Sequence, residues 1–455
     1  MTEIGTIRMK RFLLLLILVA IIGGGFLLRF QAVTYTEVDN PIRADAAKYI
    51  LYAYNLKNFG VYTHSNSGIS GNPQLLKPDA LVTPGYPLFL ALFLDNQRIT
   101  AYQYYQIQLF QVLLSTATIL LSYLLCIPLL NRNLSLVVAT LVALSPHLIN
   151  MNVYLLTETL FCFFLTAFLA VMAWIKSPTD YGRLFGAGVL FGLATLTRPY
   201  TQGFVIVSAL LLLAPSFRLG LWRVLALLLG FSVIVAPWVI RNLVVLDQVS
   251  DPTLTITSLY HGFYPGMMYE FRPESLGFPY RFDPKVNEFV YTLPGFVNEL
   301  SQRAARQPWV YFEWYLWGKT ATVFSWSILA GMGDVFVYPV IKTPYVDLSY
   351  FKSTHEFMRF THEPLMILSL VGVILAWLPA KIAPVSHKAQ WVGRFLALFI
   401  LYFMILHILG APFPRYSIPI RPVTYSMALF SLLVCWLILK QHSVSHSASS
   451  MENKS

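Results

Sequence analysis

Residues 12 to 28 read Phe12-Leu-Leu-Leu-Leu-Ile-Leu-Val-Ala-Ile-Ile-Gly-Gly-Gly-Phe-Leu-Leu28. This run has no charged or polar side chain, and it approaches the roughly 20 apolar residues that a helix needs to cross a bilayer. Arg8, Lys10 and Arg11 precede it, and no small-x-small cleavage pattern follows. The stretch therefore predicts an uncleaved membrane helix whose N-terminal end lies in the cytoplasm.

Apolar runs of this kind recur along most of the chain. Of the 455 residues, 56% are hydrophobic and 12% are charged, and this charged fraction is about half that of a soluble domain. Further spans are predicted at approximately 104–130, 134–150, 157–175, 184–197, 203–214, 224–240, 364–378, 395–409 and 418–439. The predicted fold class is an all-α polytopic membrane protein with ten or eleven transmembrane helices, amphipathic outer-face helices and a long extracytoplasmic loop.

The chain is basic, with a formal net charge of +11. The basic residues separate apolar segments and do not form a stripe, so orientation in the membrane explains them better than binding to nucleic acid. No nucleic acid is expected as a partner, whereas membrane lipid is. Cys126, Cys162 and Cys435 all lie within apolar runs, and their spacing predicts neither a disulfide framework nor a metal site.

Short basic connectors predict which loops face the cytoplasm. They lie at 131–133, 176–183 and 218–223, and the alternate connectors should lie on the opposite side. The predicted organisation has four parts. They are 1–242, a transmembrane catalytic module with a first outer loop at about 29–103; 243–360, a long extracytoplasmic loop with interfacial helices; 361–440, further transmembrane helices; and 441–455, a disordered cytoplasmic tail.

The segment 309–329 is ambiguous. Glu313, Lys319 and short apolar stretches favour an interfacial or partly inserted helix. If the segment spanned, Lys381 and Lys388 would face outward, against the tendency of basic loops to remain inside. We therefore prefer the interpretation in which 309–329 does not span.

The first outer loop opens with Arg43-Ala-Asp45-Ala-Ala-Lys48-Tyr49. Asn40-Pro41 resembles a helix start, with Asn as the cap and Pro at the first helical position. Residues three, four and seven apart share a helix face, so Asp45, Lys48, Tyr49 and Tyr52 should lie together. The helix is too polar to span, and we expect it to lie on the outer surface of the membrane.

Five motifs in this chain resemble those of GT-C glycosyltransferases. The first combines Asp45-Ala-Ala-Lys-Tyr49 with Asn58-Phe-Gly-Val-Tyr62 and Pro84-Gly-Tyr-Pro87. The others are Leu156-Thr-Glu158-Thr-Leu-Phe161, Gly192-Leu-Ala-Thr-Leu-Thr-Arg198-Pro199, Pro237-Trp-Val-Ile-Arg241-Asn242 and Arg415-Tyr-Ser-Ile-Pro419-Ile-Arg-Pro422. Within that superfamily the chain is most similar to the bacterial branch related to protein O-mannosyltransferases and the lipid A aminoarabinose transferase.

The resemblance implies an enzyme that transfers a sugar, with inversion, from a polyprenyl-phosphate donor to an acceptor hydroxyl. The acceptor would be a lipid, a glycan or a protein, and the reaction would occur at the outer face of a bacterial inner membrane, with both termini in the cytoplasm. No cofactor is certain; a divalent cation beside Asp45 is left open. Many relatives carry a second acid directly after this Asp, but this chain has Ala46 there, which puts a two-carboxylate site in doubt.

Asp45 and Glu158 are the candidate catalytic residues. Asp45 would act as general base or orient the acceptor, and apolar surroundings should raise its pKa. The plainer interpretation is a helix-face Asp paired with Lys48. Glu158 stands at the outer end of a span, where a carboxylate is costly enough to suggest a role, or where it is simply favoured by the helix dipole.

Basic residues at span ends are the candidate phosphate ligands, because guanidinium forks suit phosphate. The alternative is snorkelling toward lipid headgroups. The candidate substrate- and phosphate-binding residues are Lys48, Tyr49, Tyr86, Arg198, Arg241, Lys319, Arg415 and Tyr416. His147 and His261 have no second ligand at helical spacing, so we interpret them as structural or solvated.

Two other functions compete with a glycosyltransferase. A lipid-linked sugar flippase or transporter should place ionisable groups near mid-membrane and show two related halves. Here the charges gather at the span ends, and no internal repeat is apparent. A polysaccharide polymerase or ligase would also use polyprenyl-linked sugars, typically with its large loop late in the chain and without the early Asp45 loop.

Overall fold

Long helices form the frame of the molecule. The computed structural model describes residues 3–95, 99–175, 180–213 and 220–452. The long helices are α1 (Glu3–Tyr35), α4 (Ala101–Cys126), α10 (Leu221–Leu246), α17 (Ser349–Leu375), α18 (His387–Leu409) and α20 (Arg421–Glu452). Within the described residues, six helical segments are long and apolar enough to cross a membrane, one in each of these helices, and the last of them begins at Pro414, ahead of α20.

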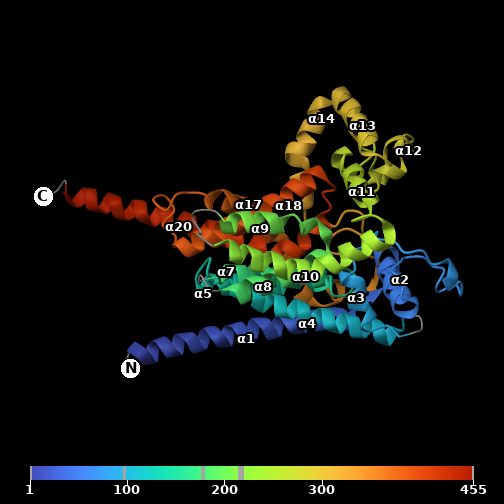
Figure 1. Ribbon diagram of the computed structural model, residues 1–455. Helices are drawn as coiled ribbons and strands as arrows, with labels where there is room; N and C mark the ends of the chain where they lie inside the picture. The colour runs from blue at the N-terminus through green and yellow to red at the C-terminus, as the bar shows by residue number, and fades with distance from the viewer. Residues whose placement is uncertain (1–2, 96–98, 176–179, 214–219, 453–455) are drawn as a thin grey trace.

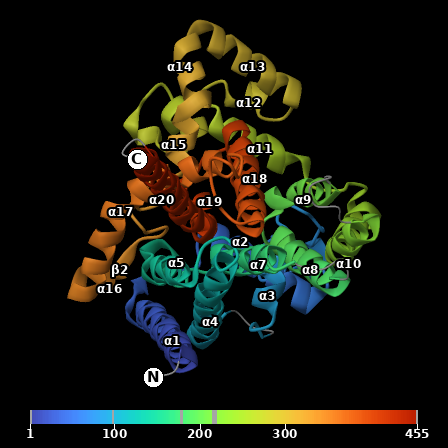
Figure 2. The same ribbon diagram turned by 90° about the vertical axis from the view of Figure 1, so that its left-hand side faces the viewer.

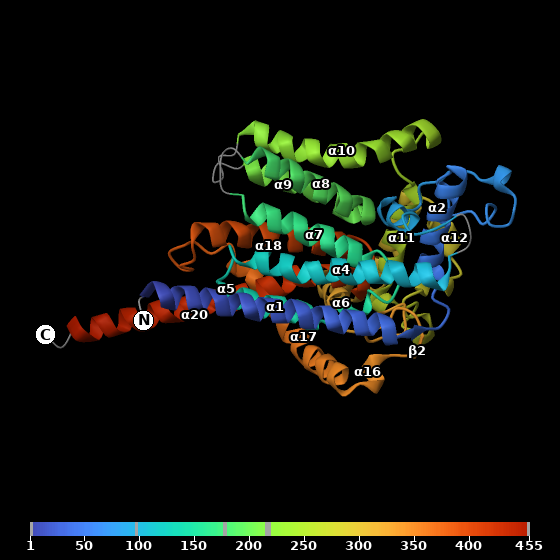
Figure 3. The ribbon, with the colours of Figure 1, turned by 90° about the horizontal axis from the view of Figure 1, so that it is seen from below.

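Four shorter helices run alongside the long ones (Figures 1 and 3). They are α5 (Arg132–Leu144), α7 (Glu158–Ala173), α8 (Tyr181–Thr197) and α9 (Phe204–Leu213). Each predicted span therefore corresponds to a helix, except that 134–150 is divided at Ser145 into α5 and the short α6 (Pro146–Asn150). In the part of the chain that the structure describes, only six helices meet the length of a bilayer by themselves, against the ten or eleven spans predicted. The multi-pass, all-α membrane fold is confirmed. Residues 176–179 and 214–219, which carry part of two predicted cytoplasmic connectors, lie outside the described residues.

Glycines bring the backbones of α8 and α10 close together. A Cβ at Gly188 would lie 2.1 Å from the carbonyl oxygen of Leu227, and a Cβ at Gly230 would lie 2.1 Å from that of Phe185. Close backbone approach through small residues is the usual way in which membrane helices associate, because lipid supplies no hydrophobic force between them. These two glycines therefore hold α8 and α10 as one layer.

The two ends of the bundle differ. Both termini lie at one end, and the short helices gather at the other (Figure 1). Those labelled at that end are α2 (Ala44–Phe59), α3 (Gly85–Ala91), α11 (Pro252–Gly262), α12 (Val286–Phe289), α13 (Leu293–Arg306) and α14 (Pro308–Glu313). The remaining short helices are α6 (Pro146–Asn150), α15 (Lys319–Val323), α16 (Pro344–Asp347) and α19 (Pro414–Ser417). Figure 2 looks along the bundle and shows α12 to α14 projecting beyond its edge.

The two strands join distant parts of the chain. β1 (Glu37–Val38) pairs antiparallel with β2 (Val340–Lys342), with Glu37 opposite Lys342. The first loop after α1 is thereby attached to the end of the long region that follows α10. The segment that the sequence left ambiguous forms a continuous helix over 308–323, through the π-helical turn η6 (Trp314–Gly318), and it is not among the six candidate spans.

Three helices cross predicted domain boundaries. α20 continues into the predicted tail as far as Glu452, and no Gly or Pro interrupts it. α1 continues to Tyr35 and α17 begins at Ser349. These helix ends do not fix where the membrane ends, so the division at 29–103 and at 361 stays a prediction.

Candidate active site

The site begins where α2 begins. α2 starts at Ala44 and not at Asn40-Pro41 as predicted. Ala44 has φ 46, a left-handed conformation that is unfavourable for a residue with a Cβ. The hydroxyl of Tyr338 bridges the turn: it donates to the carbonyl of Arg43 at 3.2 Å and accepts from the N–H of Ala46 at 3.4 Å. Tyr338 therefore fixes the backbone on both sides of Asp45.

Asp45 is paired with Arg415 from the far end of the sequence. Arg415 Nη2 donates to Asp45 Oδ2 at 2.8 Å, across 370 residues of chain. Arg415 belongs to α19, and Asp45 is in the first turn of α2, where the helix dipole favours a carboxylate. The Asp45 side chain is 36% exposed and that of Arg415 is 17% exposed, so Asp45 is the accessible member of the pair.

Glu158 holds the same Arg415 from the buried side. Arg415 Nε lies 2.7 Å from Glu158 Oε1, and Arg198 Nη2 is paired with the same oxygen. Arg198 Nε also donates to Thr157 Oγ1 at 2.7 Å. The Glu158 side chain is only 1% exposed. Asp45, Arg415, Glu158 and Arg198 thus form a row of alternating charges, called the charge row below, whose formal charges cancel.

The pKa of Asp45 shifts opposite to the prediction. Burial by itself would raise this pKa, but the charge and hydrogen bond of Arg415, together with the charges of Lys48 and Arg198, lower it below its usual value. Asp45 is therefore ionised at neutral pH. The prediction of a raised pKa was wrong because the partner lies far away in sequence.

Of the predicted tyrosine and lysine ligands, some lie beside the charge row and others only support it. Arg198 lies over the ring of Tyr416 at 5.3 Å. Tyr49 packs edge-on against Tyr86, with ring centroids 5.2 Å apart. The hydroxyl of Tyr86 is buried and donates to Gln111 Oε1 at 2.8 Å, so Tyr86 supports Tyr49 from behind. Lys48 is exposed and lies about one turn after Asp45 on α2.

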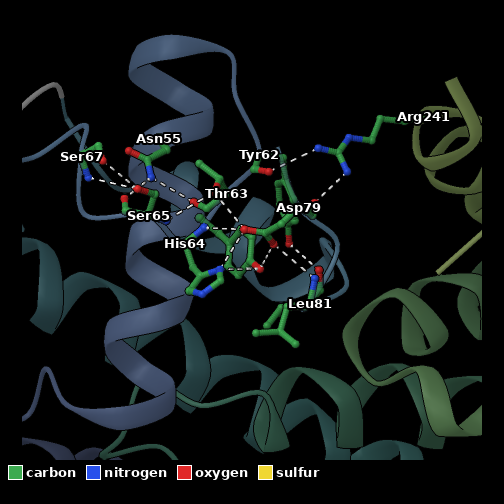
Figure 4. A network of polar contacts seen from close by, with 11 residues as sticks. Asn55, Tyr62, Thr63, His64, Ser65, Ser67, Asp79, Leu81 and Arg241 are labelled. Carbon is green, nitrogen blue, oxygen red and sulfur yellow. Dashed lines mark hydrogen bonds and ion pairs between the residues drawn. The ribbon is translucent and has the colours of Figure 1, made fainter. Parts of the chain in front are cut away.

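Arg241 belongs to a second network, shown in Figure 4. It donates to the backbone carbonyls of Asp79 at 2.8 Å and Tyr62 at 3.3 Å. The Asp79 carboxylate in turn accepts from Thr63 Oγ1 at 2.9 Å and from the N–H of His64 at 3.2 Å. The structure therefore uses Arg241 to tie the loop after α2 to α10, and does not bring it to the charge row.

Lys319 is also separate from the row. Its Nζ donates to the carbonyls of Ile408 at 2.7 Å and Gly410 at 3.0 Å and lies 3.9 Å from the ring centroid of Tyr315. The side chain is fully buried, and burial lowers its pKa to about 7. Sequence reasoning placed Lys319 near the phosphate; the structure places it at the junction of α15 and the end of α18.

His147 and His261, which were considered as metal ligands, make structural contacts instead. His147 Nε2 lies 2.8 Å from the carbonyl of Trp326, and His261 stacks on Tyr280 with centroids 4.4 Å apart. Within the described ranges, no three His, Cys, Asp or Glu side chains gather as metal ligands. Asp45 faces a guanidinium, whose charge would repel a cation, so the side chains present do not fit a bound divalent ion and no step below uses one.

Sequence reasoning missed Tyr338 and Asp79. Tyr338 fixes the start of α2, and Asp79 orders the loop after α2. The acid in Lys77-Pro-Asp79 was visible in the sequence as an isolated carboxylate in a polar loop. Tyr338 gave no signal, because its bonds are to backbone atoms 292 and 295 residues away.

Comparisons with known proteins agree with this architecture. Residues 81–240 match the sequence profile of the family described as dolichyl-phosphate-mannose-protein mannosyltransferase. No curated protein matches the chain.

Solved structures of an archaeal protein share the fold. The Archaeoglobus fulgidus oligosaccharyltransferase tethered to an acceptor peptide has a TM-score of 0.50 at 11% identity, covering 95% of this chain and 50% of that one. The same enzyme, AglB, in complex with an inhibitory peptide and a dolichol-phosphate has a TM-score of 0.51 at 12% identity, covering 96% and 52%. This chain thus spans about half the length of the protein it matches. The resemblance to GT-C membrane glycosyltransferases predicted from the sequence is confirmed by the family match over residues 81–240, and nearly the whole chain shares the fold of the archaeal enzyme.

Proposed function

We propose that this protein is an inverting glycosyltransferase that moves one sugar from a polyprenyl-phosphate donor to an acceptor hydroxyl at the outer face of a bacterial inner membrane. The observation that carries the proposal is the charge row. It presents an ionised, accessible carboxylate at Asp45 and anchors it, through Arg415, to the buried pair of Glu158 and Arg198. Such a row gives one group that can take a proton and guanidinium groups that can bind phosphate.

Asp45 would act on the acceptor. The acceptor oxygen forms a bond to the anomeric carbon while the bond from that carbon to the phosphate oxygen breaks. The electron pair leaves with the polyprenyl phosphate, and the hydroxyl proton passes to Asp45. Attack from the face opposite the phosphate inverts the anomeric centre.

Arg415 would change partner during this reaction. In the free protein its Nη2 is held by Asp45 and its Nε by Glu158. A donor phosphate at the mouth of the site would compete with Asp45 for Nη2, while Glu158 retains Nε. Loss of that contact would raise the pKa of Asp45 and make it a better base when the donor is bound. Arg415 would then stabilise the charge that builds on the leaving phosphate.

Two findings support the proposal of a lipid-linked donor. The family that matches residues 81–240 is described by its dolichyl-phosphate-mannose substrate, and the Archaeoglobus oligosaccharyltransferase is solved with dolichol-phosphate bound. The protein, lipid and glycan acceptors expected from the sequence all supply a hydroxyl. The proposed reaction at the charge row needs only an acceptor hydroxyl, so it is compatible with all three classes of acceptor.

A donor assay tests the proposal. Purified protein in detergent is incubated with a panel of radiolabelled polyprenyl-phosphate sugars, and released polyprenyl phosphate is measured. We expect release by the wild type and a loss of at least about a hundredfold in Asp45→Asn, the usual contribution of a general base. Asp39→Asn is the matched control, because Asp39 is an exposed carboxylate in the same loop. Retention of most activity in Asp45→Asn removes Asp45 from the mechanism, and a wild type that releases no lipid from any donor contradicts the function.

A further inference from the structure

A pocket lies away from the charge row, in the region that projects from the bundle. It has a volume of about 380 Å³ and lies between residues 264–285 and helices α13 and α14. This volume is within the range of about 300–1,000 Å³ that is typical of small-molecule sites. Aromatic side chains line it, namely Tyr264, Tyr269, Phe271 and Tyr311.

The charged side chains that line this pocket balance. Three are acidic and three are basic: Glu270, Asp283, Glu299, Lys285, Arg303 and Arg306. Their formal charges sum to zero, so the pocket attracts neither an anion nor a cation by its net charge. Aromatic faces combined with balanced polar groups suit an uncharged ligand that is apolar on one side and rich in hydroxyl groups on the other.

One wall of the pocket is built rigidly. Arg303 donates from Nη2 to Asp283 Oδ2 and from Nε to Glu299 Oε1, both at 2.6 Å. The hydroxyl of Tyr264 donates to the same Asp283 oxygen at 2.7 Å, and the guanidinium lies 5.0 Å from the ring centroid of Phe263. Of the two Glu299 oxygens, only Oε1 has a partner among the described residues, which leaves Oε2 to accept a hydrogen bond from a ligand.

The segment 267–271, which contributes Glu270 and Phe271 to the lining, is held in an unfavourable backbone conformation. Met267, Glu270 and Phe271 have φ values of 58, 47 and 58, in the left-handed region that residues with a Cβ avoid. Phe271 is nevertheless 53% exposed. Backbone strain that keeps an aromatic ring in solvent has no evident benefit for folding, and such strain concentrates at ligand sites.

The pocket adjoins the segment that carries Arg415. Met267 packs with Trp314, Ala411 and Phe413, and Tyr416 packs against this group. The 264–271 wall therefore rests on the same stretch of chain that positions the charge row. A ligand in the pocket would therefore lie next to the segment that carries Arg415, and the balanced charges of the lining suit an uncharged acceptor better than the phosphate-bearing donor.

We propose that this pocket binds a neutral saccharide unit of the acceptor. Phe271 stacks on the apolar face of the sugar ring, and the free oxygen of Glu299 accepts a hydrogen bond from a sugar hydroxyl. The proposal rests on the proposed glycosyltransferase function, and it selects a glycan or glycolipid acceptor over a bare protein.

Ligand-observed NMR on the full-length protein in detergent tests the pocket. The probes are methyl glycosides of glucose, mannose, galactose and N-acetylglucosamine, compared with glucuronate, inorganic phosphate and a Ser/Thr-containing peptide. We expect the wild type to bind at least one neutral glycoside and to prefer it over the charged probes. Phe271→Ala and Glu299→Gln should each weaken binding roughly fivefold to tenfold, in line with the loss of one aromatic or polar contact.

Phe282→Ala is the matched control, because Phe282 is 40% exposed in the same region but does not line the pocket. It should bind glycosides like the wild type. Binding of none of the neutral glycosides, a preference for glucuronate, phosphate or peptide, or equal binding by wild type and both pocket variants would overturn the proposal. Release of polyprenyl phosphate by the wild type, measured in the same preparation, decides the proposed function separately.

Discussion

Glu158 and Asp45 have the same charge, but burial gives them different effects on stability. Glu158 is 1% exposed and pairs with both Arg198 and Arg415. Glu158→Gln would leave two buried guanidinium groups with reduced compensation, at a cost of about 3–5 kcal/mol. Asp45→Asn removes a carboxylate that is 36% exposed, at a cost of about 0–1 kcal/mol. Thermal unfolding in detergent measures both, and equal stability of the two variants would contradict the difference in roles.

The partner exchange of Arg415 predicts two different pH dependences. In the free enzyme Arg415 lowers the pKa of Asp45, so kcat/KM should fall only below about pH 4, the ordinary value for Asp. In the complex the donor phosphate binds Arg415, and the pKa of Asp45 rises. Asp45 is then protonated, and can no longer act as a base, at a higher pH than in the free enzyme. The acid limb of kcat should therefore lie about 1–3 units above that of kcat/KM. Coincident limbs would show that Arg415 does not change partner.

At the scale of elements, the start of α2 depends on one hydroxyl. Tyr338→Phe removes the bridge between the carbonyl of Arg43 and the N–H of Ala46, so the turn that carries Asp45 loses a hydrogen bond worth about 0.5–1.5 kcal/mol. We expect donor turnover to fall about twofold to tenfold while the thermal midpoint changes little. Tyr350→Phe is the control, since Tyr350 is 46% exposed. A large loss of stability without a change in kcat would make Tyr338 a purely structural residue.

The elements also show what the sequence could and could not predict. Apolar runs located every helix of the bundle, because period and length are local properties. Glu158, Arg198 and Arg415 were identifiable as charges at span ends, and the structure gathers them with Asp45. Arg241 and Lys319 had the same appearance in sequence but bind backbone carbonyls elsewhere. Which end-of-span cation meets which carboxylate is decided by packing between segments that are hundreds of residues apart.

At the scale of the whole molecule, the bundle has the termini at one end and α2 at the other (Figure 1), and α2 carries Asp45 of the charge row. If the row faces outward, Lys48→Cys and Tyr49→Cys should react with a membrane-impermeant maleimide added to intact cells. Arg132→Cys at the start of α5 and Lys388→Cys at the start of α18 should react only after the membrane is opened. The background variant is Cys435→Ala, because Cys435 is exposed whereas Cys126 and Cys162 are buried. Labelling of Arg132→Cys in intact cells would show that the topology is inverted and that the charge row faces the cytoplasm. That result would contradict a transferase that acts at the outer face.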